Sequence, residues 1–331
     1  MTKDHSALAL FSGGLDSILA VVWMRELGCE VHPVFFSAPY IHPERAIRSA
    51  AENGLKLTVM DISQKHLAML RDPVYGYGKN VNPCIDCHAL MFREAGALLG
   101  KFKADFLISG EVVGQRPMSQ RRNALQAVDK HSGYGDLIIR PLSQKLLPDT
   151  KPIREGWVDK SKMLAIHGRG RKRQIDLANK FGISYPPPGG GCLLTDRNFS
   201  LRLRELIKHG QDTEVNIRLL RWGRHFRLED GTKLIVGRTE SDNQGLEAEV
   251  FPGLYFKIRD QEGPLGLLTD PNPSPKTIRQ AASIVLAYCS KADSPAYVKY
   301  GVDRNFACQI CVEKCPDSML RHFMISLDKE L

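Results

Sequence analysis

The sequence predicts an α/β fold, a doubly wound parallel sheet, followed by a smaller α+β domain. Two observations carry this prediction. From residue 7 to residue 141, short Val-, Ile- and Phe-rich runs alternate with amphipathic stretches, as strands alternate with helices in such sheets. From about residue 218 the pattern changes to short apolar runs separated by Asp-Gly, Asp-Asn and Pro-Gly turns, which indicates a second domain.

In the first part, the periodicity predicts five strands, four helices and a loop. The expected strands span residues 7–11, 30–38, 55–62, 104–110 and 137–141, the expected helices span 15–27, 43–55, 64–70 and 85–102, and the loop spans 72–83. Ligands of such sheets bind at the carboxyl ends of the strands. Gly13 and Gly110 follow two of these ends, and Phe36 and Ser37 lie at a third.

The next part is rich in basic residues. Helices are predicted from the basic run at 168–173 to residue 181 and over 199–209, with a Pro- and Gly-rich loop at 185–191 between them. Strands at 223–228, 233–237 and 254–258 and a helix over 275–291 are expected to follow. We therefore expect a catalytic domain at 1–198, a helical linker at 199–217 and a second domain at 218–331.

The 331-residue chain carries 46 Lys and Arg against 37 Asp and Glu, a formal net charge of +9. This balance favours a polyanionic partner, nucleic acid first. No apolar run approaches the roughly 18 residues that a membrane span needs, and residues 1–5 lack the apolar core of a signal peptide. A cytoplasmic location without a membrane partner is expected, where the eight cysteines are reduced ligands or reactive thiols rather than disulfides.

The run Phe-Ser-Gly-Gly-Leu-Asp-Ser at 11–17 lies where the first strand gives way to the first helix. Gly13 and Gly14 let the backbone approach a ligand closely, and Ser12, Ser17 and the free N–H groups of the helix start favour an anion. No Lys follows the glycines, which excludes the P-loop motif. The run resembles the pyrophosphate loop of the PP-loop ATP pyrophosphatases.

That resemblance implies a fold of the adenine-nucleotide alpha-hydrolase type, cleavage of ATP between its α and β phosphates, and adenylation of a carbonyl or carboxylate oxygen. Asp16 is the expected catalytic residue of the loop, placed to help hold Mg²⁺. The expected ATP site of this part comprises Phe11, Ser12, Gly13, Gly14, Leu15, Asp16, Ser17, Phe36 and Ser37.

Cys84 and Cys87 form a C-x-x-C pair at a predicted helix start, and Cys192 stands alone after the glycine loop. Two thiolates with this spacing can bind one metal or form a redox pair. Asn82-Pro83 followed by Cys87 is similar to the Asn-Pro-x-x-x-Cys element of tRNA 2-thiouridylases, whose cysteine pairs with one after a glycine-containing loop. This likeness matches Cys87 and Cys192 as catalytic residues, but Cys84 departs from it.

The set of three instead resembles the cluster-dependent tRNA thiolases, in which three cysteines hold a 4Fe–4S cluster and leave one iron open for sulfide. Three chemistries stay open for Cys84, Cys87 and Cys192: a 4Fe–4S cluster, persulfide or disulfide chemistry, and structural zinc. In the persulfide alternative, Cys192 carries the sulfur and Cys87 resolves it.

The stretch 109–120 follows the fourth expected strand and is similar to the Gly-Glu-x-x-Gly-Gln-x-x-Ser-Gln segment of tRNA 4-thiouridine synthases, with one extra residue before Ser119. The Arg-Pro-Leu at 140–142 also matches that family. The likeness adds Gly110, Glu111 and Gln115 to the expected ATP site.

Near the end of the chain, Cys308, Cys311 and Cys315 form a C-x-x-C-x-x-x-C-P run. Three soft ligands so close together resemble one arm of bacterial ferredoxin ligation. They predict a second metal site, for zinc or a second cluster, with Cys289 as the candidate fourth ligand. The alternative is unbound thiols in a short helix.

Residues 224–243, 263–265, 281–282 and 288–292 resemble the NFACT-R module, which binds RNA in ribosome-associated quality-control proteins. Lys and Arg supply the phosphate contacts of RNA-binding proteins. The expected RNA contacts are Arg169, Arg171, Lys172, Arg173, Arg221 and Arg224.

Together these patterns predict an ATP-dependent tRNA sulfurtransferase that adenylates a uridine carbonyl oxygen and replaces it with sulfur, using ATP, Mg²⁺ and a 4Fe–4S cluster. The expected partners are tRNA and a sulfur donor, either sulfide or a persulfide derived from a cysteine desulfurase. One alternative is a PP-loop enzyme that forms an amide or nitrile on a small molecule, which the basic second half disfavours. The other is a non-catalytic RNA- or ribosome-binding factor, which the three cysteines disfavour.

Overall fold

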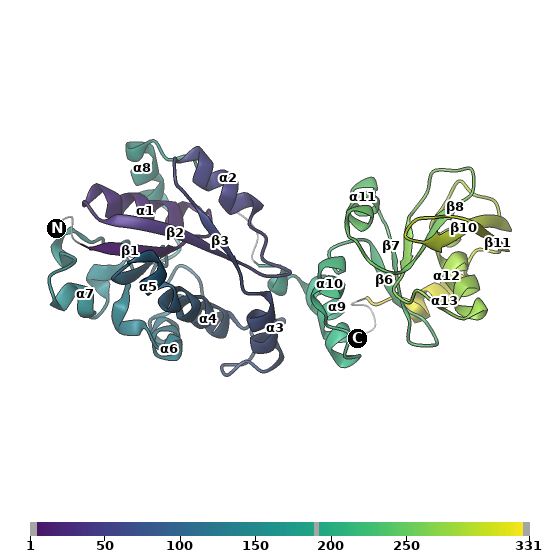
Figure 1. Ribbon diagram of the computed structural model, residues 1–331, viewed down its shortest axis with the longest axis horizontal. Helices are drawn as coiled ribbons and strands as arrows, with labels where there is room; N and C mark the ends of the chain where they lie inside the picture. The colour runs from purple at the N-terminus through teal and green to yellow at the C-terminus, as the bar shows by residue number, and fades with distance from the viewer. Residues whose placement is uncertain (1–4, 189–191, 327–331) are drawn as a thin grey trace. The chain divides into compact units, whose positions relative to one another are not determined.

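The computed structural model describes residues 5–188 and 192–326, and the chain divides into two compact units, Met1–Thr195 and Asp196–Leu331 (Figure 1). The first unit thus ends three residues before the expected boundary at 198. Residues 199–217, expected to be a linker, belong to the second unit, because Glu205 in this segment forms ion pairs with Arg227 and Lys233.

The first unit holds a five-stranded sheet in the order β3-β2-β1-β4-β5, with every neighbouring pair parallel. Its strands are β1 (Ser6–Leu10), β2 (Glu30–Ser37), β3 (Thr58–Asp61), β4 (Phe106–Ser109) and β5 (Ile138–Ile139). Its helices are α1 (Leu15–Glu26), α2 (Glu44–Glu52), α3 (Ser63–Arg71), α4 (Cys84–Ala97), α5 (Leu99–Phe102), α6 (Arg122–Ser132), α7 (Lys151–Arg154) and α8 (Lys172–Phe181). The predicted parallel sheet is confirmed.

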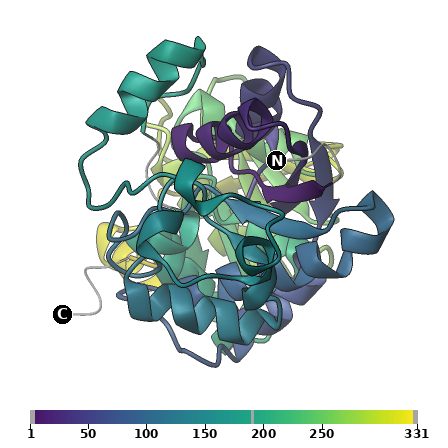
Figure 2. The same ribbon diagram turned by 90° about the vertical axis from the view of Figure 1, so that its left-hand side faces the viewer.

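Helices cover both faces of this sheet (Figures 1 and 2). Alternate residues of a strand point to opposite faces. Ala7 and Ala9 of β1 accordingly pack with Ile18 of α1, in a core that also includes α2. Leu8 packs in the opposite core, with Phe92 of α4 and part of α6. Burial on both faces explains why β1 and β4 are apolar almost throughout.

Strand β1 is where the order of the strands reverses. The chain runs from β1 to β2 and β3 on one side, then returns to β4 and β5 on the other. Open α/β sheets bind ligands at such a point, outside the carboxyl ends of the strands. The glycine loop follows β1 and Gly110 follows β4, so the fold brings the two segments side by side.

The helices of the first unit differ from the sequence prediction in three places, one of which is the single-turn α7, which was not predicted. The helix expected over 85–102 is divided: α4 ends at Ala97, and α5 is a single turn that ends at Phe102. Lys103, directly after α5, adopts a left-handed backbone conformation. Helix α6 was missed. Only Ala124, Leu125 and Val128 of this helix face the core, too short a stripe to stand out among its charged residues.

The second unit holds a six-stranded sheet in the order β11-β10-β8-β9-β7-β6, with every neighbouring pair antiparallel. Its strands are β6 (Arg224–Arg227), β7 (Lys233–Val236), β8 (Leu254–Ile258), β9 (Gly266–Leu268), β10 (Ala296–Val302) and β11 (Cys308–Val312). Its helices are α9 (Arg197–Lys208), α10 (Glu214–Leu219), α11 (Glu240–Ala248), α12 (Pro275–Ala287) and α13 (Asp317–Phe323).

Each face of the second sheet has its own core. Leu234 and Val236 pack in the core formed with α12, whereas Ile235 between them packs with residues of α10 and α11. The sequence prediction found β6, β7, β8 and α12 but missed the strands β9, β10 and β11 and the helices α10, α11 and α13. Strand β9 has only three residues, and Lys299, Gly301 and Gln309 interrupt the apolar residues of β10 and β11. No helix within the described ranges is long and apolar enough to cross a membrane.

Candidate active site

The loop after β1 is fixed by contacts to its own helix and to α2. Gly13 adopts a φ of +72°, and a Cβ there would lie 2.6 Å from the Cα of Ala46, so only glycine fits. The Gly13 carbonyl accepts a hydrogen bond from Ser49 Oγ at 2.9 Å. Ser17 Oγ donates to the carbonyl of Gly14 at 2.8 Å. The first turn of α1 therefore presents its free N–H groups from a pre-formed loop, as an anion site requires.

The other residues of the expected ATP site differ in how far their side chains are exposed to a ligand. Ser12 is exposed, whereas the side chains of Phe11 and Leu15 are buried in the core. Phe36 is buried as well, on the opposite face of the sheet. Ser37 is half-buried at the end of β2. Phe11 and Leu15 can thus contribute through their backbone, and their side chains anchor the loop in the core.

Gly110 brings the end of β4 against the loop. A Cβ at this position would lie 2.4 Å from the carbonyl carbon and oxygen of Asp16 and 2.5 Å from the nitrogen of Ser17. All three atoms belong to the backbone, so a side chain would fit only if the start of α1 moved. Glycine at this position lets the two segments meet.

Replacing Gly110 with Ala is expected to displace the first turn of α1. We expect ATP binding about 10-fold weaker and a loss of roughly 1–3 kcal/mol in the free energy of unfolding, as overpacking usually costs. Isothermal titration with a non-hydrolysable ATP analogue and urea unfolding measure the two effects. Gly100→Ala is the matched control, because nothing lies within 4 Å of a Cβ there. Equal ATP affinity in the two variants would contradict the prediction.

Two glutamines anchor the carboxylate of Asp16. Gln115 Nε2 donates to Asp16 Oδ2 at 2.6 Å, and Gln174 Nε2 donates to Gln115 Oε1 at 3.0 Å. Burial raises the pKa of Asp16, while the Gln115 hydrogen bond and the charges of Arg171 and Arg116 lower it. Asp16 Oδ1 is buried and finds no hydrogen-bond partner among the described residues. A buried carboxylate oxygen without a partner, in the first turn of the helix that follows the loop, fits a ligand of Mg²⁺.

Gln174 was not predicted from the sequence. It is fully buried on α8, in a stretch whose composition indicates only a basic amphipathic helix. Its role depends on the packing of α8 beside α1, which no local pattern reveals.

Glu111 lies in an ion-pair network and is not open to a ligand. Its Oε2 accepts a hydrogen bond from Arg140 Nε at 2.8 Å, and its Oε1 lies 2.8 Å from His88 Nδ1. Arg140 also donates to both oxygens of Asp129, at 2.7 and 3.1 Å. Glu111 and Arg140 are buried. The network links the ends of β4 and β5 to α4 and α6. Glu111 therefore has a structural role and holds the end of β4 in place.

The network predicts a pH dependence of stability. Burial raises the pKa of Glu111, but the Arg140 guanidinium and the His88 hydrogen bond outweigh it and bring the pKa to about 2, against an ordinary value of 4.5. An acid whose pKa is lower in the folded state stabilises the fold above its unfolded pKa. We therefore expect the first unit to lose about 3 kcal/mol of unfolding free energy as the pH falls from about 4.5 to 2.

Asp129 offsets part of this loss, because burial raises its pKa. Urea unfolding over a pH series measures the net change. A Glu111→Gln protein should have a flatter stability profile in the same window. If its profile matched that of the unmodified protein, Glu111 would not be the titrating group.

The three predicted sulfur-handling cysteines come together in the first unit. Cys84 and Cys87 lie in the first turn of α4, and Cys192 follows α8. After burial, the charges of Cys192 and Cys84 are the main causes that raise the pKa of Cys87. Burial of its sulfur and, to a smaller extent, the charge of Cys84 raise the pKa of Cys192. The residue as a whole is exposed. Residues 189–191 of the expected glycine loop lie outside the described residues.

A buried histidine and tyrosine extend from Cys87. His66 Nε2 lies 3.1 Å from Cys87 Sγ, and the Tyr40 hydroxyl hydrogen-bonds His66 Nδ1. Burial lowers the pKa of His66 to about 4, so its ring is neutral near pH 7. A neutral imidazole can accept the thiol proton or donate to a thiolate, depending on its tautomer. The sequence analysis missed both residues, because neither is at a recognisable spacing from the cysteines.

The cysteines and the ATP loop share neighbours. His88, the residue after Cys87, contacts Glu111, the residue after the Gly110 that touches the loop. Arg116 lowers the pKa of both Asp16 and Cys192. Arg116 is therefore close to both the anion loop and one of the thiols.

The donor set fits an iron–sulfur cluster in its chemistry, since three soft thiols gather at one site. No group of three His, Cys, Asp or Glu side chains among the described residues stands in a ready metal-binding arrangement. The thiols would have to reorient to hold a cluster. Their positions, at the first turn of a helix and in a loop, leave their side chains freer than they would be inside a helix or strand.

The cysteines near the end of the chain are not brought together as the predicted second metal site. Cys308 and Cys311 lie on β11, not in a helix, and side chains three positions apart on a strand point to opposite faces. Both are exposed, whereas Cys315 and Cys289 are buried in the core beneath α12. Over residues 192–326 the structure thus gives no ready ligand set for zinc or a second cluster.

Four of the basic residues expected to contact RNA lie in the first unit. Arg169, Lys172 and Arg173 are exposed around the start of α8. Arg171 is half-buried and lowers the pKa of Asp16, which places it close to the ATP loop. It is therefore better suited to the phosphates of a nucleotide than to an RNA strand.

The other two expected RNA contacts, Arg221 and Arg224, lie in the second unit, and each guanidinium lies over an aromatic ring. The Arg221 guanidinium lies 5.1 Å from the centre of the Trp222 ring, and that of Arg224 lies 4.4 Å from the centre of the Tyr288 ring. Such cation–π pairs hold the guanidinium in place.

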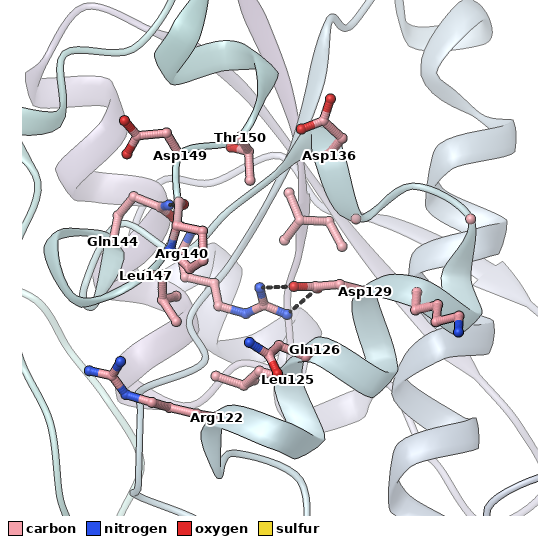
Figure 3. A pocket seen from close by; sticks show the side chains of 15 residues that line it. Arg122, Leu125, Gln126, Asp129, Asp136, Arg140, Gln144, Leu147, Asp149 and Thr150 are labelled. Carbon is pink, nitrogen blue, oxygen red and sulfur yellow. Dashed lines mark hydrogen bonds and ion pairs between the residues drawn. The ribbon is translucent and has the colours of Figure 1, made fainter.

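A cavity of about 500 Å³ opens beside β5. Figure 3 shows Arg140 paired with Asp129 on one side of it and Asp149 and Thr150 on another. Its walls carry charges of both signs, and it shares no lining residue with the ATP loop or the three cysteines.

Two family models match separate parts of the chain. Residues 2–145 match the model described as thiamine biosynthesis protein (ThiI). Residues 223–324 match the model described as NFACT protein RNA binding domain. We call these parts of the chain ThiI-type and NFACT-type after the models that they resemble. The ThiI-type part contains the loop after β1, the end of β4 and two of the three clustered cysteines, and the NFACT-type part contains the whole antiparallel sheet.

Curated proteins similar to the ThiI-type domain are tRNA sulfurtransferases. That of Aeromonas salmonicida is 27% identical over 158 residues, which cover 45% of this chain and 31% of the relative. That of Serratia proteamaculans is 27% identical over 143 residues, which cover 42% of this chain and 29% of the relative. The chain spans about a third of the length of the curated relatives it matches.

Two solved structures also align with the chain. A predicted subunit of tRNA methyltransferase from Methanocaldococcus jannaschii is 18% identical with a TM-score of 0.37, over 64% of this chain and 91% of its own. The U34-tRNA thiolase NcsA from Methanococcus maripaludis, determined with its 4Fe–4S cluster, is 15% identical with a TM-score of 0.31, over 66% of this chain and 72% of its own.

Proposed function

We propose that this protein is an ATP-dependent tRNA sulfurtransferase that adenylates a uridine carbonyl oxygen and replaces it with sulfur. One observation carries the proposal: the pre-formed anion loop and three clustered thiols belong to one unit, and Arg116 is close enough to lower the pKa of both Asp16 in the loop and Cys192. The match to the ThiI model and the similarity to tRNA sulfurtransferases support it. A tRNA substrate would place the protein in the cytoplasm.

In the proposed first step, ATP binds with its pyrophosphate on the loop after β1. The uridine oxygen attacks the α-phosphorus, a new O–P bond forms, the bond to the β-phosphate oxygen breaks, and pyrophosphate leaves. The Ser12 hydroxyl and the first N–H groups of α1, including that of Ser17, stabilise the charge on the leaving pyrophosphate. Asp16 would hold Mg²⁺ through its free oxygen, and the ion would neutralise phosphate charge.

In the second step, sulfur attacks the activated carbon and AMP leaves. We propose that Cys84, Cys87 and Cys192 deliver this sulfur. A 4Fe–4S cluster held by the three thiolates would supply an open iron that binds sulfide. In the alternative, a desulfurase-derived persulfide is carried on Cys192, Cys87 releases the product by forming a disulfide with Cys192, and a thiol reductant restores both thiols.

The NFACT-type domain is proposed to hold the tRNA. A base must leave its stack to reach a buried reaction centre, which costs a few kcal/mol. Contacts to the rest of the RNA can offset this cost, so a second, basic unit suits the reaction.

Anaerobic reconstitution with ATP, sulfide and unmodified tRNA tests the proposal, with the products read by mass spectrometry. We expect one thiouridine, one AMP and one pyrophosphate per turnover. tRNA from a deletion strain should lack one thionucleoside. Unchanged thionucleosides in that strain would reject the reaction.

Anaerobic purification tests the cluster separately. A cluster should give broad absorbance near ~400 nm and iron that falls when Cys84, Cys87 or Cys192 is replaced by Ala. Zinc without iron would reject the cluster and leave the persulfide route.

A further inference from the structure

A second cavity, of about 300 Å³, lies within the NFACT-type unit. It is formed by the start of β6, the turn between β7 and α11, residues 262–264 and the end of α12. Arg224, Arg238 and Lys291 line it, together with the ring of Tyr288. Two glutamates also line it, Glu240 and Glu262, and both are exposed.

The cations of this cavity are not neutralised by the protein. Within residues 192–326, neither Arg224, Arg238 nor Lys291 forms an ion pair with a carboxylate. Burial and then the charge of Arg238 lower the pKa of Arg224. Burial and then Arg238 also lower the pKa of Arg202, to about 10. Guanidinium groups that repel one another would be stabilised by a bound anion.

Asp242, whose charge acts on Arg224, is already hydrogen-bonded within the protein. Asp242 Oδ2 accepts hydrogen bonds from the backbone N–H groups of Arg238 and Thr239, at 3.1 Å each, and completes the capping box of α11. It orders the turn that carries Arg238. Asp242 therefore fixes the backbone of this turn. Its charge raises the pKa of Arg224, but it forms no ion pair with Arg224 or Arg238 among the described residues.

The walls are rigid. Asn243 Oδ1 accepts a hydrogen bond from Leu265 N at 3.0 Å, and its Nδ2 donates to the carbonyl of Gly263 at 3.2 Å. A Cβ at Gly237 would lie 2.0 Å from Asn243 Oδ1, so glycine is needed for this crosslink. The side-chain amide of Asn243 thus ties α11 to residues 263–265 across the cavity.

An aromatic platform adjoins the cations. The Arg224 guanidinium lies 4.4 Å from the centre of the Tyr288 ring, and its Nη1 donates to the carbonyl of Gly237 at 3.4 Å. Stacked guanidinium and aromatic planes are surfaces on which nucleobases stack, at a gain of about 1–3 kcal/mol per base. Phosphate-binding cations and a stacking surface together match the two parts of one nucleotide.

We propose that this cavity binds one nucleotide of a single-stranded RNA segment. Arg238 and Lys291 contact its phosphate, and the Arg224–Tyr288 pair supports its base. The volume is at the lower end for ligand pockets and suits a single nucleotide, not a duplex. The inference rests on the proposed tRNA substrate and names the residues with which the second unit holds it.

The test uses the full chain with both Arg238 and Lys291 replaced by Gln. Both residues are exposed, so the variant should fold. The matched control replaces Arg259 and Lys299 by Gln. It removes the same charge and also disrupts a cation–π pair, because Arg259 lies 4.2 Å from the centre of the Tyr297 ring. Fluorescence anisotropy with a labelled single-stranded RNA and an unmodified tRNA transcript measures affinity over a range of salt concentrations.

We expect the Arg238→Gln/Lys291→Gln protein to bind both RNAs about 10-fold more weakly. The slope of log affinity against log salt concentration should fall by about 0.7 for each phosphate of a single strand that the variant no longer neutralises. The control should match the unmodified protein. Equal affinity and slope in variant and control would overturn the inference. Binding of inorganic phosphate or AMP at the cavity, seen by phosphorus NMR and abolished in the variant while RNA affinity is unchanged, would also overturn it in favour of a free-phosphate site.

The thiolation assay separates this inference from the proposed reaction. If the protein forms no thiouridine but its RNA binding depends on Arg238 and Lys291, the proposed reaction fails and the nucleotide site stands. If thiouridine forms and the variant binds RNA normally, the site fails and the reaction stands.

Discussion

Replacing Cys192 with Ala is expected to lower the rate of thiouridine formation by about 1,000-fold or more, because the sulfur-handling set loses one of its three thiols. Cys192 lies in an exposed segment, so the fold should be unaffected. The ATP loop is untouched, and slow release of pyrophosphate in the presence of tRNA should persist. Mass spectrometry of the tRNA and a pyrophosphate assay measure the two steps separately.

Cys308→Ala is the matched control, since Cys308 is also an exposed thiol but lies on β11 in the other unit. It should leave thiouridine formation unchanged. An Asp16→Asn protein should lose pyrophosphate release as well as thiouridine. Normal thiouridine formation by the Cys192→Ala protein, or an equal loss in the Cys308→Ala protein, would contradict the assigned role of Cys192.

Replacing Arg140 with Met is expected to lower the free energy of unfolding of the first unit by about 3–5 kcal/mol, the usual cost of removing one partner from a buried ion pair. Glu111 and Asp129 would lose their common counter-charge, and Glu111 would remain buried. Because typical domains are stable by only about 5–15 kcal/mol, this is a large share of the total. Urea unfolding followed by circular dichroism measures the change.

Two comparisons isolate the ion pair from the loss of a long side chain. Arg154→Met removes an arginine whose pair with Asp136 is exposed, and it should lower the stability far less than Arg140→Met. Adding Glu111→Gln and Asp129→Asn to Arg140→Met should restore part of the stability, since no buried charge is then left alone. A similar loss for Arg140→Met and Arg154→Met would show that the network adds nothing to stability.

The parallel sheet and the anion loop could be predicted because their signals are local. The loop needs glycine at position 13 to bring the backbone close to Ala46, and Ser17 caps its own turn. Hydrophobic periodicity located all five parallel strands, because four are largely buried and β3, at one edge of the sheet, alternates between half-buried and exposed residues. It failed for α6, β10 and β11, whose apolar stripes are short or half exposed.

The two C-x-x-C pairs show that cysteine spacing alone does not predict whether two thiols lie close together. Cys84 and Cys87 lie in one helical turn, where residues three apart share a face. Cys308 and Cys311 have the same spacing on a strand, where residues three apart face opposite ways. The spacing is identical, and the secondary structure that surrounds it decides whether two thiols can meet.

By itself, the sequence determined the fold class, because the alternation of strands and helices is encoded in neighbouring residues, and it named a glycine loop and three cysteines as the candidate site. Only the tertiary structure decided which side chains support them. Gln115 reaches Asp16 across 99 positions, Gln174 reaches Gln115 across 59, and His66 reaches Cys87 across 21. These contacts exist because the sheet places β4 beside β1, and because α8 packs against α1 and α3 against α4. No single stretch of the sequence specifies the order of the strands in the sheet.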